Sequence, residues 1–284
     1  RKPAYKRITQ WFQQIVFLVM MWIRKKSNYQ IKLLAIILVL FIFSFKSYSQ
    51  RSGDELIIKD LKRTLDLAYN NQISNTVKID SLEKYFTKLN AVENDSLRLR
   101  NKFKIINRLI HIGADSLEKK YIKKIKDKAI SNKNRYNLAK AYVYLGNFYL
   151  KGFILDSALY NINNSEKLFL QEKDSVYLSY CYTSKSKIFT HINDYNKALE
   201  YNFKALEQSK KTKKSHPVFF AYQSIYRTLG ELENEKKAFE YYKKAISVLE
   251  KNKQQLGEYF YSYKSQAHNF MGSVYLKTEN HTKA

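Results

Sequence analysis

The stretch DYNKALEYNFKALE, residues 194–207, returns forty residues later as NEKKAFEYYKKAIS, residues 234–247, with Lys, Ala, Glu, Tyr, Lys and Ala in the same places. Small residues repeat with this period at two positions of the pattern, which are Ala158, Ala198 and Ala238, and Ser165, Ala205 and Ala245. One short amphipathic helix pair cannot bury its apolar face alone, whereas stacked copies bury it in one continuous core. The repetition therefore predicts an all-α solenoid of antiparallel helix pairs.

The composition of the chain supports this fold class. Of its 284 residues, 45% are hydrophobic and 15% aromatic, but only 7 are Gly and 2 are Pro. This is enough apolar material for a core, and too little Gly and Pro for a turn-rich β protein. We expect helices throughout, with almost no strand.

The net charge of +26 raises the question of a nucleic-acid partner, because phosphate backbones bind clustered Lys and Arg. The basic residues are instead scattered through every segment of the chain. The densest run, KKTKK at 210–214, lies between two expected helices and is interpreted as a solvated loop. No nucleic-acid partner is expected for this chain.

Residues 1–20 are interpreted as the product of a translation start placed too far upstream. Residues 1–19 contain no Met, and Met20 and Met21 stand just ahead of a basic stretch. The segment is therefore set apart from the fold.

The segment 21–49 is typical of an export signal. Three basic residues at 24–26 precede an apolar run at 33–45, and small residues follow it up to Ser49. Because this run falls below the roughly 20 residues that a membrane helix needs, we expect a signal peptide cleaved between Ser49 and Gln50. A signal anchor is the alternative. No Cys follows the run, which excludes a lipid-anchored signal.

The residue types that carry chemistry are few and dispersed. Cys181 is the single cysteine, so no internal disulfide is expected, and its helical surroundings favour a small buried packing residue. The five histidines are scattered, and the sequence has no metal-binding, phosphate-binding or nucleophile motif. We therefore expect no cofactor and no metal, and we do not expect an enzyme confined to these residues.

The clearest repeat begins at residue 139 and reads AKAYVYLGNFYLKGFILDSALYNINNSEKLFL. Its Tyr142, Leu145, Gly146 and Tyr149 stand at the spacing of the tetratricopeptide pattern W-x2-L-G-x2-Y, with Tyr in place of Trp. The three larger side chains share one helix face, and the glycine lets the two helices of a pair approach closely. The chain thus resembles the tetratricopeptide repeat family.

The other expected packing positions follow the same scheme. The recurring alanines are small where the second helix of each pair crosses the first. Asp156 and Asp194 are expected to cap the N-termini of two second helices. The packing set is completed by Gly272 and Tyr275, which stand at the first-helix spacing of the last unit.

The resulting organisation is atypical capping helices over 50–102 and repeats over 103–284. The first of these repeats, at 103–130, is degenerate. The pattern stops at Ala284, which is the small residue that opens a second helix. We therefore expect the last repeat to be truncated and the natural protein to continue.

The family resemblance implies that first helices line a concave groove, in which side chains recognise extended or helical peptides. On this geometry the candidate binding residues are Asn147, Lys151, Lys187, His191 and Arg227. They would bind an acidic protein or peptide ligand. The alternative is that they are solvated surface residues.

The layout of the chain also resembles the exported part of bacterial membrane-linked sensors, in which such repeats precede a membrane helix and a histidine kinase or a helix-turn-helix domain. This resemblance implies a non-catalytic binding module on the periplasmic side of a Gram-negative envelope. The module would be tethered through a signal anchor or a C-terminal membrane helix. The alternative is a free periplasmic scaffold or adaptor for envelope protein assembly.

Overall fold

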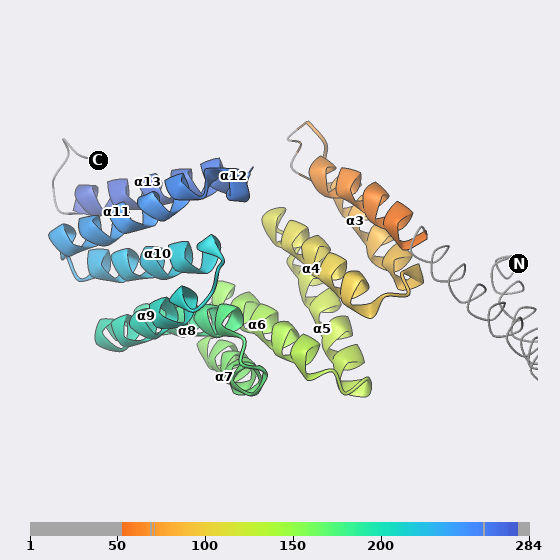
Figure 1. Ribbon diagram of the computed structural model, residues 1–284, viewed down its shortest axis with the longest axis horizontal. Coiled ribbons are helices and arrows are strands. Elements are labelled where there is room, and N and C mark those ends of the chain that lie inside the picture. The colour runs from red at the N-terminus through yellow and green to blue at the C-terminus, as the bar shows by residue number, and fades with distance from the viewer. Residues whose placement is uncertain (1–52, 69, 71, 258, 278–284) are drawn as a thin grey trace, which may run out of the picture. The chain divides into compact units, whose positions relative to one another are not determined.

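The computed structural model describes residues 53–277, apart from 69, 71 and 258. Within this part of the chain, helices are joined by turns and short loops, and there is no strand (Figure 1). The helices pack in consecutive pairs, which confirms the expected all-α solenoid. The predictions on the upstream start, the export signal and the truncated last repeat fall on 1–52 and 278–284, outside the described residues.

The chain divides after Ala114 into two compact units. The described part of the first unit contains the helix 53–67, α3 (Asn75–Lys88), the short 3-10 helix η1 (Leu89–Ala91) and α4 (Asp95–His111). Its buried apolar side chains include Leu61, Leu82, Leu89 and Ile106, which are at most 1% exposed. The helices of this unit therefore bury an apolar stripe, and Lys78 on α3 and Lys102 and Arg108 on α4 are buried beside it.

The described residues of the second unit form α5 (Asp115–Ser131), α6 (Arg135–Lys151), α7 (Leu155–Glu172), α8 (Ser175–His191), α9 (Tyr195–Lys210), α10 (Ser215–Glu231), α11 (Glu235–Lys251), α12 (Lys253–Leu256) and α13 (Tyr259–Lys277). Helix α6 pairs with α7, α8 with α9, and α10 with α11. We call α6, α8 and α10 the first helices of their pairs.

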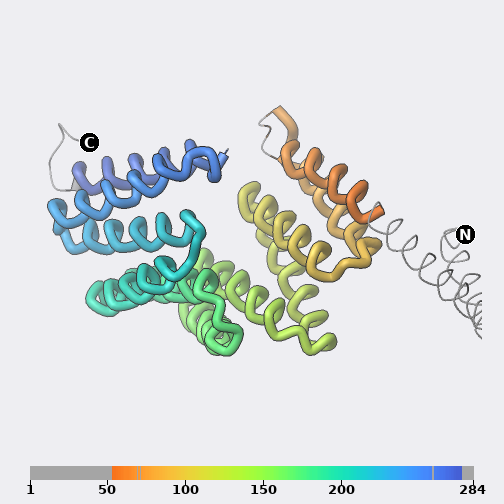
Figure 2. Tube along the Cα trace, in the orientation of Figure 1, coloured from red at the N-terminus to blue at the C-terminus, as the bar shows by residue number. Residues whose placement is uncertain are grey.

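The first helices of the second unit form a continuous layer. Helix α6 contacts α8, α8 contacts α10, and α10 contacts α13. In the described residues no contact of comparable extent joins α7 to α9 or α9 to α11. The traces of α10, α11 and α13 lie side by side (Figure 2). Neighbouring repeats are therefore joined by contacts between their first helices, and more extensively by contacts of a second helix with the first helix of the next repeat, α7 with α8 and α9 with α10.

The small residues of the repeat lie where the helices cross. The fully buried small residues are Ala158, Ala198, Ala205, Ala238, Ala245 and Ser165. The Oγ of Ser165 donates to the carbonyl oxygen of Ala139 on α6 at 2.9 Å. A Cβ on Gly146 would lie only 2.5 Å from Cδ1 of Ile162, so glycine is what allows α6 and α7 to approach this closely.

The other expected packing residues are partly or fully buried. Leu145 and Tyr275 are buried, whereas Tyr142, Tyr149 and Gly272 are half-buried. Cys181 on α8 is fully buried, and burial raises the pKa of its thiol to about 12. The thiol is therefore protonated near neutral pH and acts as a packing group, as the sequence predicts.

Several turns between helices follow a common pattern, in which a left-handed residue precedes an N-cap whose side chain accepts a hydrogen bond. Asp194 caps α9 as expected, because its carboxylate accepts from the backbone N–H of Lys197 at 3.1 Å. The prediction that Asp156 caps α7 is wrong. Ile154 occupies the cap position without a side-chain bond, and Asp156 lies in the first turn, near the positive end of the helix dipole.

The turn between α6 and α7 departs from the common pattern at two successive residues. Phe153 has φ of 57°, a left-handed conformation that costs a bulky residue about 1 kcal/mol. The missing cap at Ile154 costs about 1 kcal/mol more. This turn is therefore less stable than a turn with a suitable left-handed residue and a capping side chain would be.

Candidate binding surface on the first helices

A row of polar side chains crosses the first helices of the second unit. The forty-residue period places Asn147, Lys187 and Arg227 at the same position of α6, α8 and α10, and all three are exposed. Because α6 contacts α8 and α8 contacts α10, the three side chains occupy neighbouring helices. We call these three residues the polar row.

Within the described residues, Lys187 and Arg227 are cations without an anionic partner. Neither forms an ion pair with a carboxylate among the described residues. The pKa of Lys187 lies below its ordinary value because the surrounding protein desolvates the ammonium, and because the positive charge of Arg227 is near. The side chain of Lys187 is nevertheless exposed to solvent. Its ammonium is thus crowded by protein and still accessible, as expected for a recessed surface.

Neighbouring side chains position the other two members of the polar row. The guanidinium of Arg227 lies over the ring of Phe270, 4.7 Å from its centroid. The Oγ of Ser184 donates to Oδ1 of Asn147 at 2.7 Å. The amide nitrogen of Asn147 has no hydrogen bond within the described part of the chain, and is available as a donor. One amide donor beside two cations is a suitable set for carboxylates and backbone carbonyls.

A strip of aromatic rings runs across the same helices and onto α13. The ring centroids of Tyr177 and Tyr180 on α8 are 5.8 Å apart, and Tyr180 lies 6.4 Å from Phe220 on α10. Phe220 in turn lies 5.2 Å from Tyr263 on α13, and Tyr136 on α6 extends the strip at the other end. We call these five residues the aromatic strip. Such partly exposed aromatic side chains are typical of protein interfaces.

The aromatic strip and the polar row share one face. Lys187 follows Tyr180 by seven residues, and Arg227 follows Phe220 by seven, which is about two helical turns in each case. Burial raises the pKa of Tyr180, so its hydroxyl stays protonated and can donate. We call the strip and the row together the first-helix surface. It offers apolar contact area beside a concentrated positive charge.

Two of the residues that the sequence predicted for binding lie outside this surface. The ammonium of Lys151 forms ion pairs with Asp115 at 2.6 Å and with Glu118 at 3.1 Å, both on α5. The ring of His191 lies 4.9 Å from that of Phe153, at the turn between α6 and α7. The structure therefore brings together Asn147 and the two unpaired cations, and places Lys151 and His191 at the helix ends.

Several residues of the surface were not predicted from the sequence. Tyr180 and Phe220 are forty residues apart, so the period itself could have revealed them. Tyr263 departs from the period because α12 and the turn after it separate α11 from α13, and the equivalent position 260 is a buried Phe. Phe270 and Ser184 are identified only by their contacts with Arg227 and Asn147.

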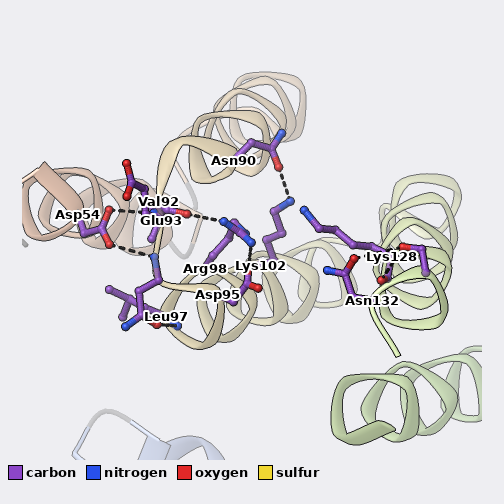
Figure 3. Close-up of polar contacts among 12 residues, drawn as sticks. Asp54, Asn90, Val92, Glu93, Asp95, Leu97, Arg98, Lys102, Lys128 and Asn132 are labelled. Carbon is purple, nitrogen blue, oxygen red and sulfur yellow. Dashed lines mark hydrogen bonds and ion pairs between the residues drawn. The ribbon is translucent and has the colours of Figure 1, made fainter. Parts of the chain in front are cut away.

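The first unit contains a separate recess of about 860 Å³ between the helix 53–67 and α4. Its lining combines apolar and cationic side chains, which include Ile58, Leu65 and Leu97, and Lys59, Lys62 and Lys104. At one end, the carboxylate of Asp54 accepts hydrogen bonds from the backbone N–H groups of Glu93 and Asn94 at 3.2 and 3.3 Å (Figure 3). No buried polar atom without a partner lines this recess in the described residues, so its geometry specifies no particular ligand.

Among the described residues, no group of three or more His, Cys, Asp and Glu side chains is placed to hold a metal ion. Over the same residues, no helix combines the length and the hydropathy needed to cross a bilayer.

These features define an all-α helical-repeat solenoid with an aromatic and cationic face on its first helices. No family model matches the chain, and no curated protein matches it. Among solved structures, the chain is similar in fold to BtubC (BKLC) from P. vanneervenii, with a TM-score of 0.54 and 16% sequence identity. The match covers 79% of this chain and 86% of that chain. At this identity the likeness concerns the fold alone.

Proposed function

We propose that this chain is a non-catalytic module that binds an acidic segment of a partner protein on its first-helix surface. The carboxylates of the segment pair with Lys187 and Arg227, and its backbone accepts a hydrogen bond from Asn147. Apolar side chains of the segment pack on the aromatic strip. The same role is implied by the resemblance to the tetratricopeptide repeat family.

The observation that carries this proposal is the unpaired pair of cations. The ammonium of Lys187 is partly desolvated and lies near the positive charge of Arg227. Both effects disfavour the charged form of the lysine and lower its pKa. A bound carboxylate reverses this effect, because it supplies the missing opposite charge. The free energy released on pairing then contributes to affinity and to selection of acidic ligands over basic ones.

An array of short synthetic peptides, in which acidic, basic and aromatic residues are varied systematically, tests the proposal. We expect the protein to retain peptides that combine Asp or Glu with an aromatic residue. The matched control is Lys213→Glu, which replaces a lysine by a glutamate in the loop 211–214, where Lys213 is exposed, and should leave the selection unchanged. Equal retention of acidic and basic peptides would contradict the proposal.

The lowered pKa of Lys187 gives the binding a pH dependence of defined sign. Because a bound carboxylate raises this pKa, binding takes up protons, and affinity falls as pH rises through the lowered pKa of the free protein. The decline should therefore begin below the ordinary lysine value of 10.5. Titrations with a selected peptide that lacks Tyr, Lys and Cys measure it. Lys187→Arg should abolish the decline, because arginine stays charged.

We further propose that the module works outside the cytoplasm, as the sensing part of a longer membrane-linked regulator. The proposal is supported by the order of basic, apolar and small residues in 21–49. The alternative, a free periplasmic scaffold, would use the same binding surface. Intact-mass measurement on the envelope fraction should give a chain that begins at Gln50. A mass that retains 21–49 would rule out cleavage and favour a signal anchor.

A further inference from the structure

The three helix pairs of the second unit are built on one pattern. Small residues stand at the same two positions of α7, α9 and α11. Each of these second helices contacts the first helix of its own pair and the first helix that follows. Repeats this similar can exchange stacking partners, within one chain or between two chains. A contact that differs from one boundary to the next is needed to keep the pairs in order.

The boundary between α7 and α8 contains an ion pair at a position that is apolar in the neighbouring pairs. Lys185 lies on α8 at the place that Leu145 occupies on α6 and Ile225 on α10, and all three residues are buried. The ammonium of Lys185 pairs with the carboxylate of Glu166 on α7. Their side chains are only 8% and 18% exposed. The middle pair therefore has a charged group where its neighbours have a hydrocarbon.

The surroundings of this ion pair come from three helices. The hydroxyl of Tyr182 on α8 donates a hydrogen bond to the carboxylate of Glu166. The ammonium of Lys185 lies over the ring of Tyr201 on α9, 5.3 Å from its centroid. Each charge thus has the other as its counter-ion and a second partner besides. The pair is satisfied only while α7, α8 and α9 hold their present positions.

The next boundary, between α9 and α10, cannot form the same ion pair. The residue of α9 equivalent to Glu166 is Leu206, which packs with Ile225 of α10 in one apolar cluster. If α10 stacked on α7, Glu166 would face Ile225 and lose its ammonium. If α8 stacked on α9, Lys185 would face Leu206. A buried charge without a counter-ion is strongly unfavourable, so both wrong stackings are disfavoured.

A different polar contact marks the boundary between α9 and α10. Asn202 on α9 is fully buried, and its amide nitrogen lies 3.2 Å from the carbonyl oxygen of Ser224 and 2.9 Å from Oγ1 of Thr228, both on α10. The equivalent residues of α7 and α11 are Ile162 and Tyr242, which have no side-chain amide. The two boundaries of the middle pair therefore carry different polar contacts.

We propose that the ion pair of Lys185 and Glu166 selects α8 as the helix that follows α7, and so fixes the order of the repeats. Replacing a buried ion pair by apolar residues often leaves stability unchanged or raises it, so stability alone explains the pair poorly. The best-attested role of buried polar groups is to set register among similar partners. Neither residue belongs to the first-helix surface, so the inference does not depend on the proposed peptide binding.

Joint refolding of two mismatched full-length variants tests the inference. Lys185→Glu places two carboxylates at the boundary between α7 and α8, and Glu166→Lys places two ammonium groups there. The boundary is thus mismatched within either chain. When α8–α13 of one chain stack on α5–α7 of the other, each boundary again combines one carboxylate with one ammonium. The proposal therefore predicts that the two variants associate by exchanging these halves.

The measurement is capture through an affinity tag on one chain after joint refolding from urea, with the untagged chain quantified by intact mass. Tagged Lys185→Glu should capture about five-fold more Glu166→Lys than tagged wild type captures untagged wild type. The wild-type mixture also measures any association through the apolar residues 33–45. Capture at the wild-type level would overturn the proposal.

A second variant shows whether the single changes act through the mismatch. Combining Glu166→Lys with Lys185→Glu in one chain restores a matched boundary. Each single change should lower the urea midpoint by about 2 M, and the combination should recover most of that loss. The combined variant should also capture itself no more than wild type does. A combined variant as unstable as the single ones would contradict a selective role for the pair.

An exposed ion pair provides the charge-matched control. Glu207 and Lys211 pair at 2.7 Å on α9, and their side chains are 66% and 51% exposed. Mixing Lys211→Glu with Glu207→Lys makes the same charge changes away from the boundary, and capture should stay at the wild-type level. Equal capture by this mixture and by the Lys185 and Glu166 variants would indicate general charge attraction and overturn the proposal.

Discussion

Phe169→Ala is expected to destabilise the second unit by about 3–5 kcal/mol, because it removes a fully buried ring from a close-packed core. Phe169 lies on α7 and stacks on Tyr177 of α8, with centroids 4.7 Å apart and ring planes 9° apart. Its ring centroid also lies 5.6 Å from that of Tyr136 on α6, in an edge-to-face arrangement. The ring therefore joins three helices and supports one end of the aromatic strip.

The measurement is urea unfolding followed by circular dichroism, in parallel with Leu170→Ala. Leu170 is the next residue along α7 and is 53% exposed, so its truncation should change stability by about 0.5 kcal/mol or less. Near-ultraviolet dichroism should also weaken in Phe169→Ala, because Tyr177 loses its stacking partner. Similar unfolding midpoints for the two variants would show that α7 does not pack on α6 and α8 in this way.

The second large effect concerns binding. Changing Lys187 and Arg227 to Glu together should weaken the binding of a selected acidic peptide about 30-fold, or ~2 kcal/mol. Two attractive charges become repulsive in the variant, while both positions remain exposed and the core is untouched. Exposure and salt screening limit the effect of each charge, so the loss should shrink as ionic strength is raised.

The fold could be predicted from the sequence because its determinants are local and repeated. The alanines at 158, 198 and 238 recur at one spacing, and each lies fully buried at a helix crossing. Gly146 could be assigned to a close approach for the same reason, since its neighbours in the motif fix the face on which it lies. The period also placed Asn147, Lys187 and Arg227 at equivalent positions, which the first-helix layer then brings together.

The structure corrects one predicted helix cap and adds one set of ion pairs that the sequence did not predict. A cap at Asp156 was expected because Asp is a good capping residue, but α7 begins one residue before it, after an isoleucine that cannot cap. The carboxylates that hold Lys151 lie on α5, more than thirty residues earlier in the chain, where no repeat spacing indicates them. Long-range side-chain pairing of this kind follows from the packing of specific helices and is not encoded in the motif.

The aromatic strip illustrates a further limit. Tyr180 and Phe220 obey the period, but Tyr263 joins them because the connection through α12 changes the register of α13. A change of register between helices cannot be read from a repeat motif, because the motif describes positions within a unit. In the sequence, these aromatic residues are therefore indistinguishable from ordinary helix residues. Only the structure shows that they form one surface.

Calorimetric titration of one array-selected acidic peptide into the wild type and into the variant with Lys187 and Arg227 both changed to Glu tests the central claim most directly. The Lys213→Glu protein serves as the charge-matched control. The account predicts a Kd that rises about 30-fold in the double variant and stays at the wild-type value in the control. An unchanged Kd in the double variant, or an equal rise in the control, would contradict binding at the first-helix surface.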